Sequence, residues 1–123
     1  MNEEAERTQI HPRALVVSHA GRNYIVPPDF QGLFAIGRGS SCEIVLDSRI
    51  VSRLHGCIRV TNGRYSYRDT SSNGTVVTRG HDETLVHDEE VELPEAGALR
   101  IGDVMLHFTT QPPPDASTGD YQT

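Results

Sequence analysis

The chain of 123 residues contains no lysine and no tryptophan, and it has only two cysteines. All 11 basic residues are therefore arginines, whose planar forks of N–H donors suit carboxylates and phosphates. Cys42 and Cys57 are too few for a disulfide framework. Both stand in runs typical of strands, so we expect buried free thiols rather than a bridge, and hence a reduced, cytoplasmic setting.

Long apolar runs and excess positive charge are also missing. No stretch approaches the roughly 20 apolar residues of a membrane helix, and the polar N-terminus does not resemble a signal peptide. We therefore expect no membrane partner. The net charge of −6 argues against a nucleic-acid partner, because such binding depends on neutralising phosphates.

Composition divides the chain into three parts. Residues 1–12 are polar and predict a flexible N-terminal arm. Residues 13–110 predict a single domain, whose size allows a modest apolar core. Residues 111–123 are rich in proline and small polar side chains, and they predict a disordered tail or a linker.

Short runs of β-branched and aromatic residues fill the domain, with turn residues between them. The expected strands are 14–18, 23–26, 33–37, 43–46, 57–60, 64–69, 75–77, 91–93, 98–101 and 104–108. Turn signals recur roughly every 8–12 residues, which is the spacing of a β-sandwich or barrel. No window has a sustained helical period, so an α/β enzyme with crossover helices is not expected. The fold class is predicted to be all-β.

The stretch from Asp82 to Glu95 is strongly acidic and holds seven carboxylates. The segment DETLVHDEE, residues 82–90, is the only helix candidate in the domain, and it is a weak one. An edge strand or a solvated loop explains its charge better. His81 and His87 add metal-ligand types, but a second, well-spaced ligand set is missing. We therefore expect no metal site and no cofactor.

Three polar loops lie next to expected strands, at residues 37–41, 51–55 and 71–75. In a sandwich, such loops gather at one end. Together they offer arginine forks, hydroxyls and a side-chain amide, which suit a phosphate dianion attached to a peptide. By contrast, the Asn62-Gly63 pair lies between two amphipathic strands and predicts only a hairpin turn.

These three loops resemble the motifs of the forkhead-associated (FHA) domain family. The matching residues are Gly37-Arg38, the Ser-x-x-His pattern of Ser52 to His55, and Asn73-Gly74. The likeness covers roughly residues 14–109. It implies a β-sandwich of about eleven strands in two twisted sheets, whose loops at one end bind phosphothreonine in partner proteins.

The resemblance also implies a role for individual residues. Phosphate binding falls to Arg38, Ser52, Arg53 and Ser72, and Asn73 is the clamp on the peptide backbone beside the phosphothreonine. A guanidinium suits the first role because it donates two parallel hydrogen bonds and keeps its charge. An amide suits the last because it donates and accepts at once.

Other residues are expected to support the site or to select the ligand. Structural support is assigned to Gly37, His55, Gly74 and Thr75. The candidates for reading the residue three positions after the phosphothreonine are Arg49, Ile50 and Arg79. Acidic and aliphatic preferences both stay open there, although a basic rim would favour an acidic residue.

Three other possibilities were weighed beside phosphothreonine recognition. Ser52 and His55 lie only three residues apart in a loop, without an orienting acid or oxyanion device, so enzymatic activity is not expected. A phosphate-independent docking or dimerisation domain is the main alternative function. A phosphorylated Thr8 in the N-terminal arm would offer an intramolecular ligand for Arg38 and Ser52.

Overall fold

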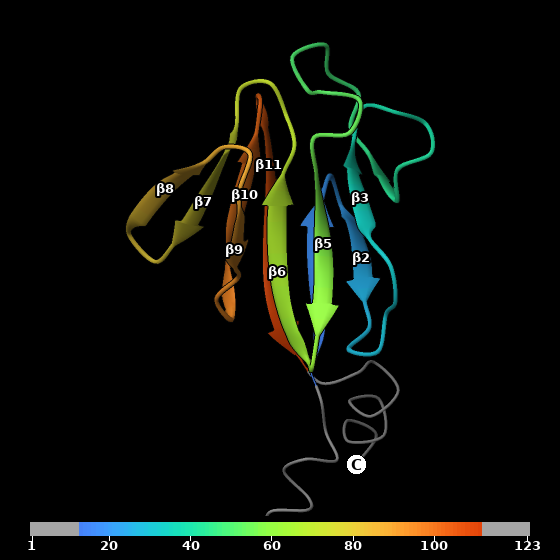
Figure 1. Ribbon diagram of the computed structural model, residues 1–123, viewed down its shortest axis with the longest axis vertical. Helices are drawn as coiled ribbons and strands as arrows, with labels where there is room; N and C mark the ends of the chain where they lie inside the picture. Colours follow the sequence, from blue (N-terminus) through green and yellow to red (C-terminus); the bar gives the residue numbers. More distant parts are fainter. Residues whose placement is uncertain (1–12, 112–123) are drawn as a thin grey trace, which may run out of the picture.

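The computed structural model describes residues 13–111, which form eleven β-strands and no helix (Figure 1). The strands are β1 (Ala14–His19), β2 (Arg22–Val26), β3 (Phe34–Gly37), β4 (Ile44–Val45), β5 (Gly56–Thr61), β6 (Arg64–Asp69), β7 (Thr75–Arg79), β8 (Asp82–Val86), β9 (Glu90–Glu92), β10 (Ala96–Ile101) and β11 (Val104–Gln111). Within this part of the chain, nothing helical could cross a membrane.

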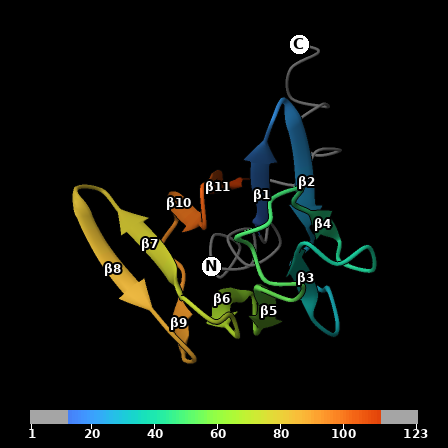
Figure 2. The same ribbon diagram turned by 90° about the horizontal axis from the view of Figure 1, so that it is seen from above.

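The strands form two sheets that face each other, as the view from above shows (Figure 2). The six-stranded sheet has the order β2-β1-β11-β10-β7-β8, and the five-stranded sheet has the order β4-β3-β5-β6-β9. All pairs are antiparallel except β3 with β4. The predicted all-β sandwich of about eleven strands is confirmed.

The core lies between the two sheets and takes every second residue of the central strands. Leu15 and Val17 of β1 face Ile58 of β5 and Tyr67 of β6, and all four side chains are fully buried. This alternation follows from the strand geometry, in which successive side chains point to opposite faces. Each fully buried large apolar side chain contributes roughly 1.5–3 kcal/mol, so the pattern strongly specifies the register.

For the acidic stretch the edge-strand alternative is confirmed, whereas the expected placement of Cys42 in a strand is wrong. The acidic stretch forms no helix, because β8 pairs with β7 along its whole length after the turn at Gly80. Instead, β8 and β9 are the outer strands of their sheets, as the edge-strand alternative proposed. Cys42 does not lie in a strand but in the loop after β3, where it is half-buried.

The pairing of β3 with β4 is also unusual, because parallel strands normally need a long crossover. Only six residues, Arg38 to Glu43, separate these two strands. The loop folds back on itself, with the Glu43 N–H donating to the Ala35 carbonyl and the Leu46 N–H donating to the Gly37 carbonyl. The loop after Gly37 is thereby held close to the end of its own strand.

The ends of the described chain and the loops of the predicted site lie at opposite ends of the sandwich. Ala14 pairs with Gln111, so the first and last strands meet at one end. Gln111, the first residue of the expected tail, therefore belongs to β11, and the rest of the tail and the whole arm lie outside the described residues. The Asn62-Gly63 turn joins β5 to β6 with positive φ at both residues, which confirms the predicted hairpin. The loops of the predicted site lie at the opposite end (Figure 1).

Candidate functional site

Three loops meet at one end of the sandwich: residues 38–43, residues 46–55 and the β6–β7 turn at 70–74 (Figure 1). Backbone hydrogen bonds join the first two, because the N–H groups of Arg38 and Gly39 donate to the carbonyls of Ser52 and Arg53, both at 2.9 Å. The third is joined to the second where the Thr70 N–H donates to the His55 carbonyl at 3.0 Å. The sequence prediction that these loops gather is confirmed.

Arg38 is exposed, but its guanidinium is tethered. Its Nε donates to the Val51 carbonyl at 3.0 Å. No carboxylate of residues 13–111 forms an ion pair with it. The two terminal nitrogens therefore stay available for the parallel pair of hydrogen bonds that a guanidinium makes to an oxyanion.

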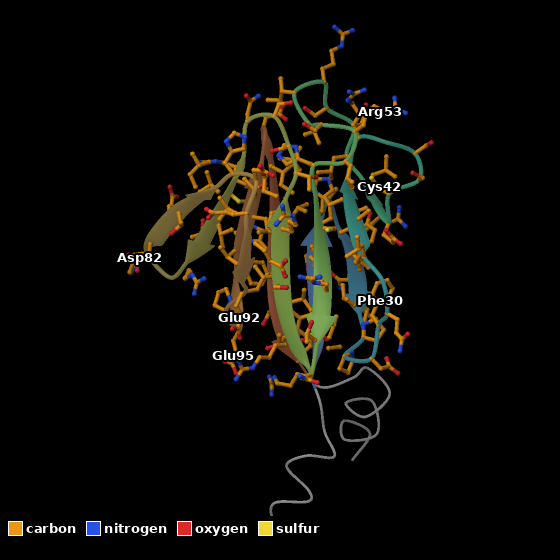
Figure 3. All side chains as sticks on the ribbon, viewed as in Figure 1. Phe30, Cys42, Arg53, Asp82, Glu92 and Glu95 are labelled. Atoms are coloured by element: carbon orange, nitrogen blue, oxygen red, sulfur yellow. The ribbon has the colours of Figure 1, made fainter. Side chains whose placement is uncertain are left out.

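Ser52 lies between two loops and is half-buried. Its Oγ accepts the backbone N–H of Ser72 at 3.3 Å, which leaves its own hydroxyl proton free to donate. Arg53 is exposed at the same end of the sandwich, where Figure 3 labels it. The structure thus brings Arg38, Ser52, Arg53 and Ser72 to one end.

His55 is buried and joins two loops through its ring. Its Nδ1 accepts the backbone N–H of Ser52 at 3.1 Å. Its Nε2 lies 3.0 Å from the Gly74 carbonyl, and it must carry the proton because Nδ1 is used as an acceptor. Since Nδ1 contacts the Ser52 backbone and not its hydroxyl, the pair does not form a nucleophile and its base.

Asn73 projects from the turn between β6 and β7. The residue is exposed, and its side-chain amide has no hydrogen-bond partner within residues 13–111. Gly74 follows with a φ of 93°, a conformation that disfavours any side chain. Only Gly74 of this pair has a positive φ, whereas both Asn62 and Gly63 have one, so the two Asn-Gly pairs form different turns.

A buried polar network beneath this turn was missed by the sequence analysis. The Asp69 carboxylate, which is fully buried, accepts hydrogen bonds from Ser71 Oγ at 2.7 Å and Thr75 Oγ1 at 2.9 Å. It also accepts the backbone N–H groups of Ser71 and Asp88. Ser71 Oγ in turn accepts the Gly74 N–H at 2.8 Å. Asp69 therefore shapes the turn that presents Asn73.

Tyr67 completes this network from the core side. Because the Thr75 hydroxyl donates to Asp69, the Tyr67 hydroxyl is the donor in its 2.7 Å contact with Thr75 Oγ1. Burial raises the pKa of Tyr67 and keeps it protonated for this role. The detectable signal was Asp69 followed two residues later by serine, since aspartate commonly accepts the N–H two residues on.

Position 37 requires a glycine because there is no room for a side chain, and not because of its backbone φ. A Cβ at this position would overlap the Arg53 carbonyl and the His55 N–H. The close approach lets the end of β3 run against the loop that carries Ser52. This placement explains why a glycine directly precedes Arg38.

The specificity candidates lie in different places. Arg49 and Ile50 form an exposed turn at the site end, and Ile50 lies against the β10–β11 turn at Gly102. Arg79 is not brought to the site: it ends β7 opposite Asp82, and its Nη2 donates to the Glu92 carbonyl at 2.9 Å. Figure 3 labels Asp82 and Glu92, which lie away from Arg53.

A cavity of about 270 Å³ opens beside Asn73. Its lining residues come from four segments of the fold and are Ile50, His55, Asn73, Gly74, Val76, Leu85, Arg100 and Gly102. The side chains of Ile50, Val76 and Leu85 make its walls largely apolar. An aliphatic side chain would fit such a cavity.

The cysteines and acidic side chains form no further reactive centre in the described part of the chain. Burial raises the pKa of the Cys42 and Cys57 thiols, and both are free. Cys42 Sγ donates to the Arg53 carbonyl at 3.3 Å. Among residues 13–111, no three histidine, cysteine, aspartate or glutamate side chains converge to hold a metal ion.

A family model described as "FHA domain" matches residues 34–102, which contain all three loops. The chain belongs to the FHA domain family. Members of this family are in general interaction modules rather than enzymes, and several are known with phosphopeptides bound. The resemblance drawn from Gly37-Arg38, Ser52 to His55 and Asn73-Gly74 is therefore confirmed.

Solved structures of other FHA domains share this fold. The Mycobacterium tuberculosis EmbR structure, in complex with a low-affinity phosphopeptide, is 31% identical with a TM-score of 0.66. That match covers 80% of this chain and 24% of EmbR, so the FHA domain spans about a quarter of the EmbR chain.

Two further structures are similar over nearly their whole length. One, from a study of phosphothreonine-dependent FHA domain interactions, is 25% identical with a TM-score of 0.67, over 81% of this chain and 99% of its own. The FhaA FHA domain, complexed with the intracellular domain of Rv3910, is 26% identical with a TM-score of 0.62, over 76% and 98%. A search of curated proteins found no match.

Proposed function

We propose that this FHA domain recognises phosphothreonine peptides and thereby forms phosphorylation-dependent protein–protein contacts in signalling. The observation that carries the proposal is the tethered guanidinium of Arg38. Its Nε is held by the carbonyl of Val51, the residue before Ser52, and its terminal nitrogens form no ion pair within residues 13–111. The EmbR structure with a phosphopeptide supports the same ligand class for this chain.

Each recognition residue has a chemical task in this proposal. Arg38 makes two charge-assisted hydrogen bonds to the phosphate, and Ser52 donates a third from its free hydroxyl proton. Ser72 and Arg53 add a hydroxyl and a positive charge at the rim. Asn73 pairs with the peptide backbone beside the phosphothreonine, so the domain reads a phosphorylated segment and not free phosphate.

Selectivity for the residue three positions after the phosphothreonine is assigned to Ile50 and the cavity beside it. The walls formed by Ile50, Val76 and Leu85 favour an aliphatic side chain there. Arg49 lies next to Ile50 and favours an acidic residue at a neighbouring position. Arg79 has no part in this selectivity, given its distance along β7 from the site loops.

The proposed setting is the cytoplasm, with phosphothreonine-containing protein segments as partners. The proposed role requires no cofactor and no catalysis, because binding alone links two proteins. Thr8 lies outside the described residues, so phosphorylated Thr8 as an intramolecular ligand stays a prediction. The link from Thr8 to Ala14 spans only about 20 Å when fully extended. Since Ala14 lies at the end opposite the site, this length favours binding of Thr8 to a second copy.

Calorimetric titration with three matched peptide pools tests the proposed function. The pools carry phosphothreonine, phosphoserine or unphosphorylated threonine at a fixed position among degenerate residues. We expect binding to the phosphothreonine pool alone, with a Kd for selected peptides of roughly 1 μM. Equal binding to all three pools, or to none, would move the function to the phosphate-independent docking or dimerisation alternative.

A further inference from the structure

Four side chains form a row across the outer face of the six-stranded sheet, beside the candidate site. Strand register puts Leu85 of β8 opposite Val76 of β7, Val76 opposite Arg100 of β10, and Arg100 opposite Met105 of β11. We call Leu85, Val76, Arg100 and Met105 the outer row. Their chain neighbours Val86, Val77 and Leu106 belong to the core, so the outer row faces away from it.

Apart from Arg100, the side chains of the outer row are apolar, and the row is accessible at both ends. Leu85 is 60% exposed and Met105 is 42% exposed, while Val76 between them is half-buried. Ile50, at 57% exposure, adds a fourth large apolar side chain at the site end. Exposed apolar side chains that gather in one place, as Ile50, Val76 and Leu85 do around the cavity, mark binding surfaces more often than isolated exposed residues do.

Arg100 differs from the arginines of the five-stranded sheet because no carboxylate in the described part of the chain neutralises its charge. On the five-stranded sheet, Arg59, Arg64 and Arg68 each lie within 4 Å of a carboxylate, the closest pair being Arg59 with Glu90 at 2.6 Å. Within residues 13–111, Arg100 has no such partner although it is exposed. An acidic group on a ligand would complement it between the apolar side chains.

The outer row is also continuous with the peptide clamp. Val76, Leu85 and Arg100 line the same cavity as Asn73 and Ile50. Four adjacent strands span three interstrand spacings, or about 14 Å, which an extended peptide covers with four or five residues. A segment that reaches Leu85 at the cavity therefore crosses the sheet to Met105 within this number of residues.

We propose that the outer row binds the segment that flanks the phosphothreonine in the partner protein. That segment is extended and carries aliphatic side chains for Leu85 and Met105, with an acidic residue opposite Arg100. This inference rests on the proposed function and enlarges its ligand from a short motif to a segment several residues longer. The added contacts are apolar and charge-complementary and do not involve the phosphate.

Fluorescence-anisotropy titration of the full chain with two phosphothreonine peptide pools tests the inference. The short pool has about three degenerate residues on each side of the phosphothreonine. The long pool extends it by about five positions on each side, enriched in aliphatic and acidic residues. A length control carries glycine and serine at those added positions. We expect the long pool to bind roughly 10-fold more tightly than the short pool and the length control.

Three variants separate the outer row from the rest of the sheet. Met105→Glu should abolish the extra affinity of the long pool and leave the affinity for the short pool unchanged. The matched control is Thr109→Glu, which lies on the same strand and the same exposed face but opposite Ala96. This variant should keep the extra affinity of the long pool. Arg100→Glu should shift the selected residues in the long pool from acidic to basic. Thermal melting of each variant checks that the fold is intact.

The outcomes separate the two proposals. If the short pool binds and the long pool binds no tighter, the outer row is not part of the site, although the phosphothreonine function stands. If neither pool binds, both proposals fail. A chain that dimerises without peptide, and becomes a monomer with Met105→Glu in sedimentation, would assign the outer row to a second copy and overturn the inference.

Discussion

The His55 ring connects two loops of the site from beneath, with its Nε2 3.0 Å from the Gly74 carbonyl. Its Nδ1 accepts the Ser52 N–H at 3.1 Å, so a single buried side chain positions both the serine loop and the Asn73 turn. His55 is buried beneath these loops, so it acts on the site mainly by holding them in place. Its effect on binding is therefore indirect and should follow its effect on stability.

Replacing His55 by alanine should lower stability and affinity together. The variant leaves the Ser52 N–H and the Gly74 carbonyl unpaired and opens a cavity, which should cost about 3 kcal/mol of unfolding free energy. Denaturant unfolding measures this loss. Asn73→Ala is the contrasting variant, because it should reduce phosphopeptide affinity while changing stability by less than about 0.5 kcal/mol. Equal loss of stability in both variants would contradict these roles.

Replacing Arg38 by alanine should remove most phosphopeptide binding. Loss of one partner from a hydrogen-bonded charge pair costs roughly 2–5 kcal/mol, which calorimetry would record as a large rise in Kd. Arg38→Lys should recover only part of the affinity, because an ammonium keeps the charge but not the fork. Arg64→Ala removes the same charge on another strand and should bind as the unchanged chain does. Wild-type affinity in Arg38→Ala would refute the site.

Asp69→Asn should weaken binding through the turn that it shapes. An amide in place of the carboxylate turns an NH₂ group toward donors, which leaves at least one of them unpaired at about 1–3 kcal/mol. We expect a several-fold rise in Kd even well below the melting temperature, where the chain is fully folded. Tyr67→Phe removes only the far end of the network, so it should lower the melting temperature and preserve affinity. Unchanged affinity in Asp69→Asn would mean that the network serves stability alone.

Glu90 should contribute to stability in a pH-dependent way. Hydrogen bonds from Arg59 and then Ser66 hold the pKa of Glu90 below its ordinary value of 4.5. Because the folded pKa lies below the unfolded one, the stabilisation is present above about pH 4.5 and is lost as the pH falls through the folded value. Unfolding free energies measured from about pH 6 to pH 3 should fall less steeply in Glu90→Gln. Identical slopes would contradict this role.

Much of the fold was decided by local patterns that can be read directly. The alternation of buried and exposed residues in β6 specifies a strand, because a one-residue shift would expose its core face. The β-branched residues of β1 and β5 favour strands as well. Asn62-Gly63 specifies a hairpin because both residues tolerate positive φ. The acidic β8 was harder to predict, since an exposed edge strand lacks a clean apolar alternation and its pairing with β7 comes from elsewhere in the chain.

The sequence by itself determined the sandwich, its family and the chemical types of the recognition residues, because spacing and composition carry that information. Only the tertiary structure decided how these residues act. In the folded chain Arg38 donates to the Val51 carbonyl, and the Ser52 hydroxyl accepts the Ser72 N–H and so can still donate its own proton. Arg79 lies away from the loops and donates to the Glu92 carbonyl. The tertiary structure also aligns four distant strands so that Arg100 lies between Val76 and Met105. Such relations depend on hydrogen bonds and strand register between segments far apart in the chain, which no local pattern specifies.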